Sequence, residues 1–156
     1  AAFLNIALAA PFAAGPLYKV PREAPSDIRI AEIIRKQTPS EARLIIAGEN
    51  LATLLYYSAR PAWTMEFQSI GKPLPYYLHS SRFTARSDAQ IAVEENAMKT
   101  AVTWLEYYRG LGASFFVCAN KPIADRHADL MAHLRAHYRE ISGDDESFYL
   151  FDLNGT

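Results

Sequence analysis

The sequence predicts a three-layer α/β domain, built on a Rossmann-like open sheet of about four mostly parallel strands with flanking helices. The first observation is a set of four short apolar runs that are typical of strands covered on both faces. These runs span residues 43–47, 62–67, 113–118 and 147–153. The second observation is a stretch with helical character between each pair of runs, an alternation typical of parallel strands joined by right-handed crossovers. With 156 residues, half of them apolar, the chain is long enough for one such domain.

The N-terminal part differs from the rest in composition. Residues 1–18 contain no Asp, Glu, Lys, Arg or His but are interrupted by Pro11, and they fall short of the roughly 20 apolar residues that a membrane span needs. Two interpretations stay open: a membrane-exit or processed-leader remnant, and an ordinary buried helix or arm. Three prolines within 15–25 predict an extended connector. We therefore expect a remnant and Pro-rich connector over 1–25, and a single α/β domain over 26–156.

The first two helices are predicted on either side of the first strand. Ser26 is a suitable N-cap for a helix over 27–37 that ends before Pro39. A second, shorter helix is expected over 49–58. Residues 68–86 contain one glycine, two prolines and two tyrosines and show no periodicity, which predicts one long loop.

The remaining helices flank the third strand. Ser87 and Gln90 have the spacing of a capping box and predict a long helix ending near Leu111. Another helix is expected over 125–140. The third strand is the most apolar of the four, so we expect it to be central.

Composition excludes several classes of function. Sixteen Lys and Arg against seventeen Asp and Glu give a net charge of −1, which disfavours nucleic acid as a partner. The single cysteine excludes an intramolecular disulfide and any zinc site with several cysteines. The chain has neither of the two glycine-rich phosphate-binding motifs and no nucleophile elbow. We therefore expect no nucleotide cofactor.

Candidate ligand-binding residues follow from the fold, because open α/β sheets bind ligands beyond the carboxyl ends of their strands. Four residues lie at or just after predicted strand ends and are candidates on this basis: Glu49, Asn50, Cys118 and Asn120. Two more candidates, Tyr76 and Tyr77, are aromatic residues of the long loop that can stack on a ligand. Five of the six have a structural alternative. Glu49 and Asn50 are also suitable helix caps, the tyrosines are suitable for packing, and Cys118 has no base assigned to it and also suits a buried position.

One predicted helix carries, on one face, three side chains of the types that bind metals: Asp129, His133 and His137. The spacing of four between the histidines is compatible with zinc. The row lacks the H-E-x-x-H arrangement and a supported distant ligand, so we expect no metal site. His127 lies nearer the apolar stripe and is expected to pack at the edge of the core.

In layout, the chain resembles the soluble C-terminal region of bacterial multi-span glycosyltransferases of the protein mannosyltransferase and aminoarabinose transferase kind. The resemblance covers about residues 26–153, apart from the apolar start. It rests on 35–39 (RKQTP), 43–47 (RLIIA), 55–61 (LYYSARP), 104–113 (WLEYYRGLGA) leading into 115–117 (FFV), and 137–141 (HYREI) before an aromatic strand.

The resemblance implies a donor sugar linked to polyprenyl phosphate, and catalytic acidic residues in membrane loops that have no counterpart here. It therefore implies a non-catalytic accessory domain on the periplasmic, extracytoplasmic side of the bacterial inner membrane. Its expected partners are the membrane-embedded part of the same protein and the lipid-linked sugar or acceptor. Two alternatives stay open: a stand-alone α/β module with a small-ligand crevice at the strand ends, and a small cysteine- or metal-dependent enzyme.

Overall fold

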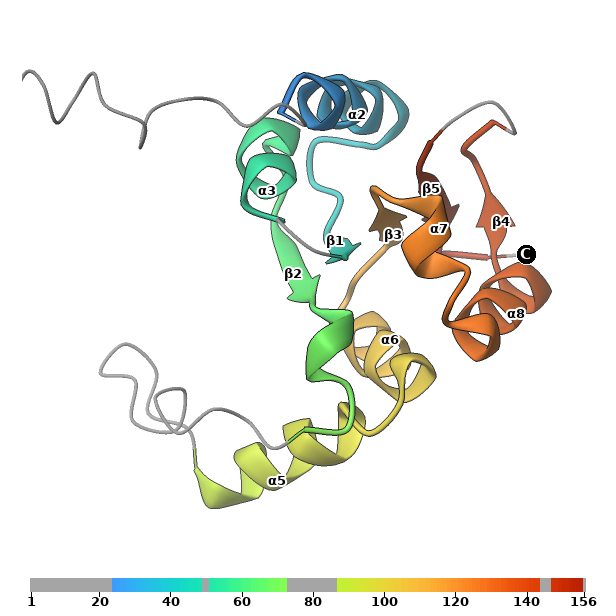
Figure 1. Cartoon of the computed structure of the whole chain (residues 1–156). Helices are drawn as coiled ribbons and strands as arrows, with labels where there is room; N and C mark the ends of the chain where they lie inside the picture. The colour runs from blue at the N-terminus through green and yellow to red at the C-terminus, as the bar shows by residue number, and fades with distance from the viewer. Residues whose placement is uncertain (1–23, 49–50, 73–86, 144–146, 156) are drawn as a thin grey trace, which may run out of the picture.

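A five-stranded open sheet with helices on both faces forms the centre of the molecule (Figure 1). The computed structural model describes residues 24–48, 51–72, 87–143 and 147–155. The strands are β1 (Leu44–Ala47), β2 (Ala62–Met65), β3 (Phe115–Cys118), β4 (Arg139–Glu140) and β5 (Tyr149–Asp152). They lie in the order β2-β1-β3-β5-β4. The mixed α/β class and the open sheet predicted from the sequence are thus confirmed.

Six α-helices and one 3₁₀ helix are present among the described residues. They are α2 (Ala24–Gln37), α3 (Ala52–Ser58), the 3₁₀ helix η2 (Phe67–Ser69), α5 (Asp88–Ala97), α6 (Ala101–Gly110), α7 (Lys121–Ala124) and α8 (Ala128–His137). Because α2 already begins at Ala24, the prediction that Ser26 is its N-cap is wrong. None of the helices among the described residues is long and apolar enough to cross a membrane.

The first three strands are mutually parallel, as predicted. Leu44 of β1 lies opposite Ala62 of β2 on one side and opposite Phe115 of β3 on the other. All four residues of both β1 and β3 are buried, because strands at the centre of a sheet are covered by helices on both faces. The apolar runs therefore predicted the centre of the sheet.

The far edge of the sheet differs from the prediction. Strand β5 is antiparallel to β3, with Phe151 opposite Phe116, and the sheet has a fifth strand, β4, that is antiparallel to β5. The crossover through α7 and α8 leads to a strand that runs in the same direction as β3. That strand is β4, which lies within the helix predicted over 125–140, and the chain then returns as β5 between β3 and β4.

Two apolar clusters cover the two faces of the sheet. Because side chains alternate along a strand, Leu44 and Ile46 face the cluster formed with α2 and α3. Ile45 and Ala47 face the cluster formed with α6 and α8, which includes Trp104. The clusters place α2 and α3 on one face and α6 and α8 on the other, which makes three layers.

The long helix predicted from Ser87 to about Leu111 is two helices. Its start is confirmed, since the Ser87 side chain accepts from the Gln90 amide and Gln90 accepts from the Ser87 amide. The break follows from a second capping box, in which the Thr100 and Thr103 side chains each accept from the other's backbone amide. Thr103 Oγ1 also donates to Ala97 O at 2.6 Å. The two hydroxyls form hydrogen bonds with backbone amides and a carbonyl that, in a continuous helix, would bond to other backbone groups.

We expect Thr100→Ala to lower the free energy of unfolding by about 1 kcal/mol, because the N-cap of α6 is lost. Thr100→Ser keeps the accepting hydroxyl and should retain most of the stability. Urea unfolding followed by circular dichroism measures both variants. Equal losses in the two variants would contradict a capping role.

Candidate functional site

The carboxyl edge of the parallel strands is where the sequence places its candidate ligand-binding residues. After β1 the chain passes to α3, whose Leu54 packs on one face of the sheet. After β3 it passes to α7, whose Ala124 packs on the opposite face. The chain thus leaves two neighbouring strands in opposite directions, which is the topological position where open α/β sheets bind ligands.

Two of the six candidate residues can be placed at this edge. Cys118 ends β3 and Asn120 follows it. The other four, Glu49, Asn50, Tyr76 and Tyr77, lie outside the described residues. At the end of β1, Gly48 has a φ of 131°, a backbone conformation that glycine adopts without strain.

Asn120 caps the short helix α7. Its Oδ1 accepts a hydrogen bond from the backbone amide of Ile123 at 3.2 Å, and its side chain is exposed. The side-chain oxygen of Asn120 is therefore engaged by the fold beside the end of β3.

Cys118 is fully buried, and its Sγ donates to the carbonyl oxygen of Asn120 at 3.5 Å. Burial raises the pKa of the thiol to about 11, because an apolar environment disfavours the thiolate. The thiol is consequently protonated at neutral pH, whereas a reactive cysteine needs a lowered pKa. Its surroundings are those of a small buried hydrophobe.

We expect native Cys118 to react with iodoacetamide at roughly one hundredth of the rate of a free thiol near pH 8, because burial and the raised pKa suppress the thiolate. Unfolding in urea should restore the rate. Mass spectrometry of the alkylated chain measures both conditions, and equal rates in buffer and urea would contradict this environment.

Charged and aromatic residues meet at the same edge around Tyr149, which lies opposite Cys118 in the sheet. The Tyr149 hydroxyl donates to Asp125 Oδ1 at 2.9 Å and accepts from Arg135 Nη2 at 3.0 Å. Lys121 Nζ lies 4.9 Å from the centre of the ring. The sequence does not indicate this cluster, because its members belong to three separate elements and no sequence motif sets the spacing between them.

His127 packs at the edge of the core, as predicted. Its ring is half-buried and stacks on Phe67 with the ring centres 4.2 Å apart. This contact ties the loop before α8 to the 3₁₀ helix that follows β2.

A second polar cluster, also missed by sequence analysis, joins α6 to the end of α8. Glu106 Oε1 accepts from the Tyr138 hydroxyl and lies 2.8 Å from His133 Nε2, and Glu106 Oε2 accepts from Arg109 Nε at 2.7 Å. His137 Nδ1 lies 2.9 Å from the carbonyl oxygen of His133. Across the described ranges, no three His, Cys, Asp or Glu residues are placed to hold a metal ion.

The electrostatics of this cluster favour an ionised Glu106. Burial acts to raise its pKa, but the hydrogen bonds from Tyr138, His133 and Arg109 outweigh burial and lower the pKa to about 2. Burial and the bond to Glu106 raise the pKa of Tyr138 to about 12. The carboxylate therefore acts as the shared acceptor that holds α6 against α8.

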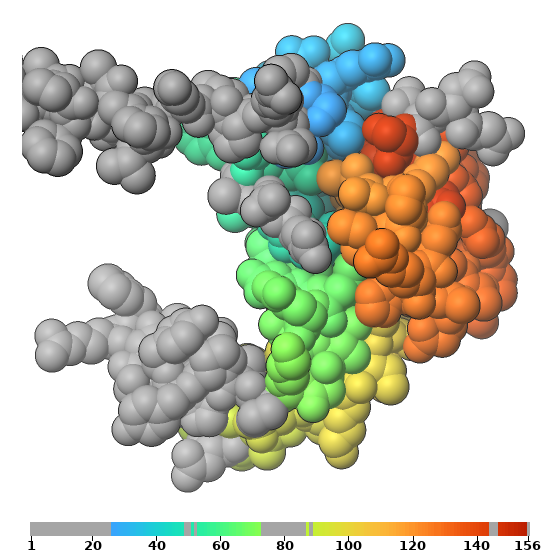
Figure 2. Space-filling model, in the orientation of Figure 1, coloured from blue at the N-terminus to red at the C-terminus, as the bar shows by residue number. Residues whose placement is uncertain are grey.

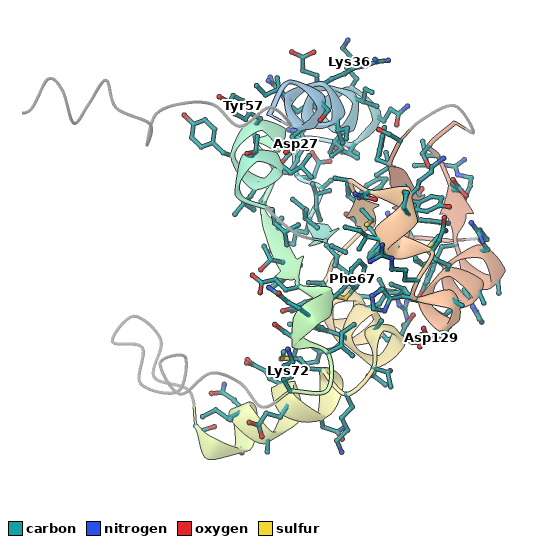
Figure 3. All side chains as sticks on the ribbon, in the orientation of Figure 1. Asp27, Lys36, Tyr57, Phe67, Lys72 and Asp129 are labelled. Atoms are coloured by element: carbon teal, nitrogen blue, oxygen red, sulfur yellow. The ribbon has the colours of Figure 1, made fainter. Side chains whose placement is uncertain are left out.

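The outer side of α2 and α3 carries exposed aromatic and basic side chains. Leu55, Tyr56 and Tyr57 in α3 are 38%, 78% and 44% exposed. A hollow of about 340 Å³ on the same layer is lined by Glu32, Arg35, Lys36 and Arg60. Figure 3 shows Lys36 and Tyr57 on the outside of this layer.

Arg60 lines this hollow and forms hydrogen bonds to the end of α2. Its Nη2 donates to the carbonyl oxygens of Arg35 at 3.1 Å and Thr38 at 3.0 Å. These carbonyls lie at the C-terminal end of α2, where a cation interacts favourably with the helix dipole. The guanidinium thus ties the end of α3 to the end of α2.

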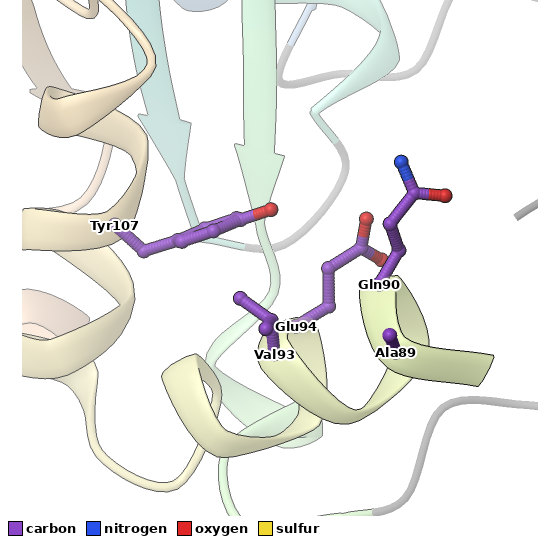
Figure 4. Close-up of a pocket in the computed structure, with 5 residues that line it drawn as sticks. All are labelled: Ala89, Gln90, Val93, Glu94 and Tyr107. Carbon is purple, nitrogen blue, oxygen red and sulfur yellow. The ribbon is translucent and has the colours of Figure 1, made fainter. Parts of the chain in front are cut away.

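A further hollow lies between α5 and α6 (Figure 4). It measures about 260 Å³ and is lined by Ala89, Gln90, Val93, Glu94 and Tyr107. The Gln90 side-chain oxygen is already engaged by the Ser87 amide in the capping box. The hollow is separated from the α2–α3 layer, since α5 lies at the opposite end of the molecule in Figure 2.

Comparison of the chain with known protein families, with curated proteins and with solved structures gives no match in any of the three.

Proposed function

We propose that this chain is a non-catalytic accessory domain of a membrane glycosyltransferase that uses a polyprenyl-phosphate-linked sugar. In this proposal the domain lies on the extracytoplasmic side of the bacterial inner membrane. It packs beside the membrane-embedded part of the same protein, where it supports that part or handles the acceptor.

The observation that carries the proposal is the exposure of the Leu55-Tyr56-Tyr57 segment of α3. This segment belongs to one of the phrases on which the family resemblance rests. It lies on the outer layer with α2, the helix that follows the apolar N-terminal stretch in the sequence. An exposed group of aromatic side chains on this layer supports a role in contact with a neighbouring surface.

Deletion of residues 26–156 from the membrane protein that carries them tests this function. We expect sugar transfer to fall, although the catalytic carboxylates implied by the family resemblance remain in the protein. The purified chain, mixed with lipid-linked sugar donor and acceptor, should give no turnover. Turnover by the chain alone, or full activity after the deletion, would overturn the proposal.

The topological switch between β1 and β3 favours a second candidate, a stand-alone module that binds a small ligand at the strand ends. In this candidate the three parallel strands, β2-β1-β3, act as a Rossmann-like ligand-binding unit. Nuclear magnetic resonance of the labelled chain in the presence of small-molecule mixtures tests it. Shifts confined to the amides of Gly48, Ala119 and Asn120 would support this candidate, and no shift there would count against it.

A further inference from the structure

We propose that the outer face of α2 and α3 rests on an anionic lipid surface, with a headgroup phosphate in the hollow formed by Glu32, Arg35, Lys36 and Arg60. We call these four residues, together with Leu55, Tyr56 and Tyr57, the α2–α3 face. The inference deepens the proposed function and rests on it in one respect, namely that the domain works beside a membrane.

The charge of the hollow favours an anionic ligand. Three of the four side chains around the hollow are cations and one is a carboxylate, although the whole chain has a net charge of −1. Arg35 and Lys36 are exposed, so their donors can reach a ligand from solvent. Each basic residue near an anionic bilayer contributes about 1 kcal/mol of attraction, which makes a lipid phosphate a favourable occupant.

The aromatic pair is the second argument. The rings of Tyr56 and Tyr57 meet edge to face with their centres 5.1 Å apart, and Arg60 follows only three residues after Tyr57. Tyrosine combines an apolar ring with a polar tip, and such side chains are enriched where a bilayer meets water. Basic residues beside exposed tyrosines are typical of a surface that lies on a membrane.

The composition of the face favours lipid over a folded protein partner. A stable protein interface covers about 800 Å² on each side and has a core depleted in charged residues. Here the layer of α2 and α3 carries three exposed side chains with apolar surface and four charged ones around the hollow. A bilayer surface accommodates both kinds of group at once, because rings enter the headgroup layer while cations meet phosphates.

Vesicle co-sedimentation of the full chain tests the inference. The probes are phosphatidylcholine vesicles with and without phosphatidylglycerol. We expect Arg35→Gln/Lys36→Gln to weaken binding to the anionic vesicles roughly tenfold or more. Tyr56→Ser/Tyr57→Ser should weaken it several-fold, and added salt should reduce the difference between the wild-type chain and the charge variant, because salt screens exposed charges.

Matched controls remove the same kinds of side chain elsewhere. Lys72→Gln/Lys99→Gln removes two exposed cations, and Val93→Ser/Leu111→Ser removes two exposed apolar side chains. Figure 3 shows Lys72 at the opposite end of the molecule from Lys36. Both controls should bind vesicles as the wild-type chain does, and circular dichroism verifies that all variants fold. Arg60 is left intact because it caps α2.

Two results would overturn the inference: equal vesicle binding by the α2–α3 variants and the wild-type chain, or equal losses in the variants and their controls. Every variant retains residues 1–18. Any vesicle binding by that apolar stretch is therefore the same in all variants and does not affect the differences between them. The deletion experiment separates the two proposals. If deletion impairs sugar transfer while the α2–α3 variants bind normally, the accessory function stands and the lipid contact fails.

Discussion

Phe151→Ala is expected to lower the free energy of unfolding by about 3–5 kcal/mol, because it opens a cavity in a fully buried core. The Phe151 side chain has no exposed surface, and its ring centre lies 6.4 Å from that of Phe116 on the neighbouring strand. The residue belongs to β5, which has a strand on each side. Urea unfolding followed by tryptophan fluorescence measures the loss.

The control for this substitution is Tyr56→Ala, which removes an aromatic side chain that is 78% exposed. Its effect should stay within about 0.5 kcal/mol. Phe151→Leu fills much of the cavity and should retain more stability than Phe151→Ala, so the comparison holds even if the alanine variant unfolds. Similar losses for Phe151→Ala and Tyr56→Ala would contradict the placement of β5 inside the sheet.

Acid is expected to destabilise the contact between α6 and α8 through Glu106. Its pKa in the folded chain is about 2, against an ordinary value of 4.5. A lowered pKa means that the carboxylate stabilises the fold above pH 4.5, and that this contribution is lost as the pH falls from 4.5 towards 2. The side chain is 31% exposed, and solvent screening reduces the contribution to about 1–2 kcal/mol.

Glu106→Gln removes the charge at every pH and is the matched variant. The difference in free energy of unfolding between the wild type and Glu106→Gln should be about 1–2 kcal/mol near neutral pH and should shrink below the ordinary carboxyl pKa. Urea titrations at several pH values measure it. A difference that does not change with pH would show that the carboxylate charge does not hold α6 against α8.

The centre of the fold was predictable because it is encoded locally. Residues 44–47 and 115–118 are unbroken apolar runs, and short runs rich in β-branched and aromatic residues are typical of strands covered on both faces. The edge was not predictable. Strand β4 consists of two exposed residues, Arg139 and Glu140, which carry no apolar signal, so the return of the chain and the antiparallel direction of β5 stayed hidden.

The candidate site was predictable only where a residue follows a strand. Cys118 and Asn120 lie at the carboxyl edge of the sheet, as predicted, because parallel strands bring their carboxyl ends to the same edge. Arg109 is three residues from Glu106 on the same helix. The other partners of Glu106, and those of Tyr149, depend instead on tertiary packing: Asp125 is 24 residues from Tyr149, and Tyr138 is 32 residues from Glu106. No short motif links residues at such separations.

The position of β5 also governs the order in which the molecule takes shape during synthesis. This strand follows the other described strands in the sequence, yet it occupies an interior place between β3 and β4. Until residues 149–152 have left the ribosome, β3 exposes an unpaired edge and β4 has no neighbour. An open strand edge of this kind invites pairing with other chains. The emerging polypeptide consequently stays vulnerable to aggregation until translation has passed β5.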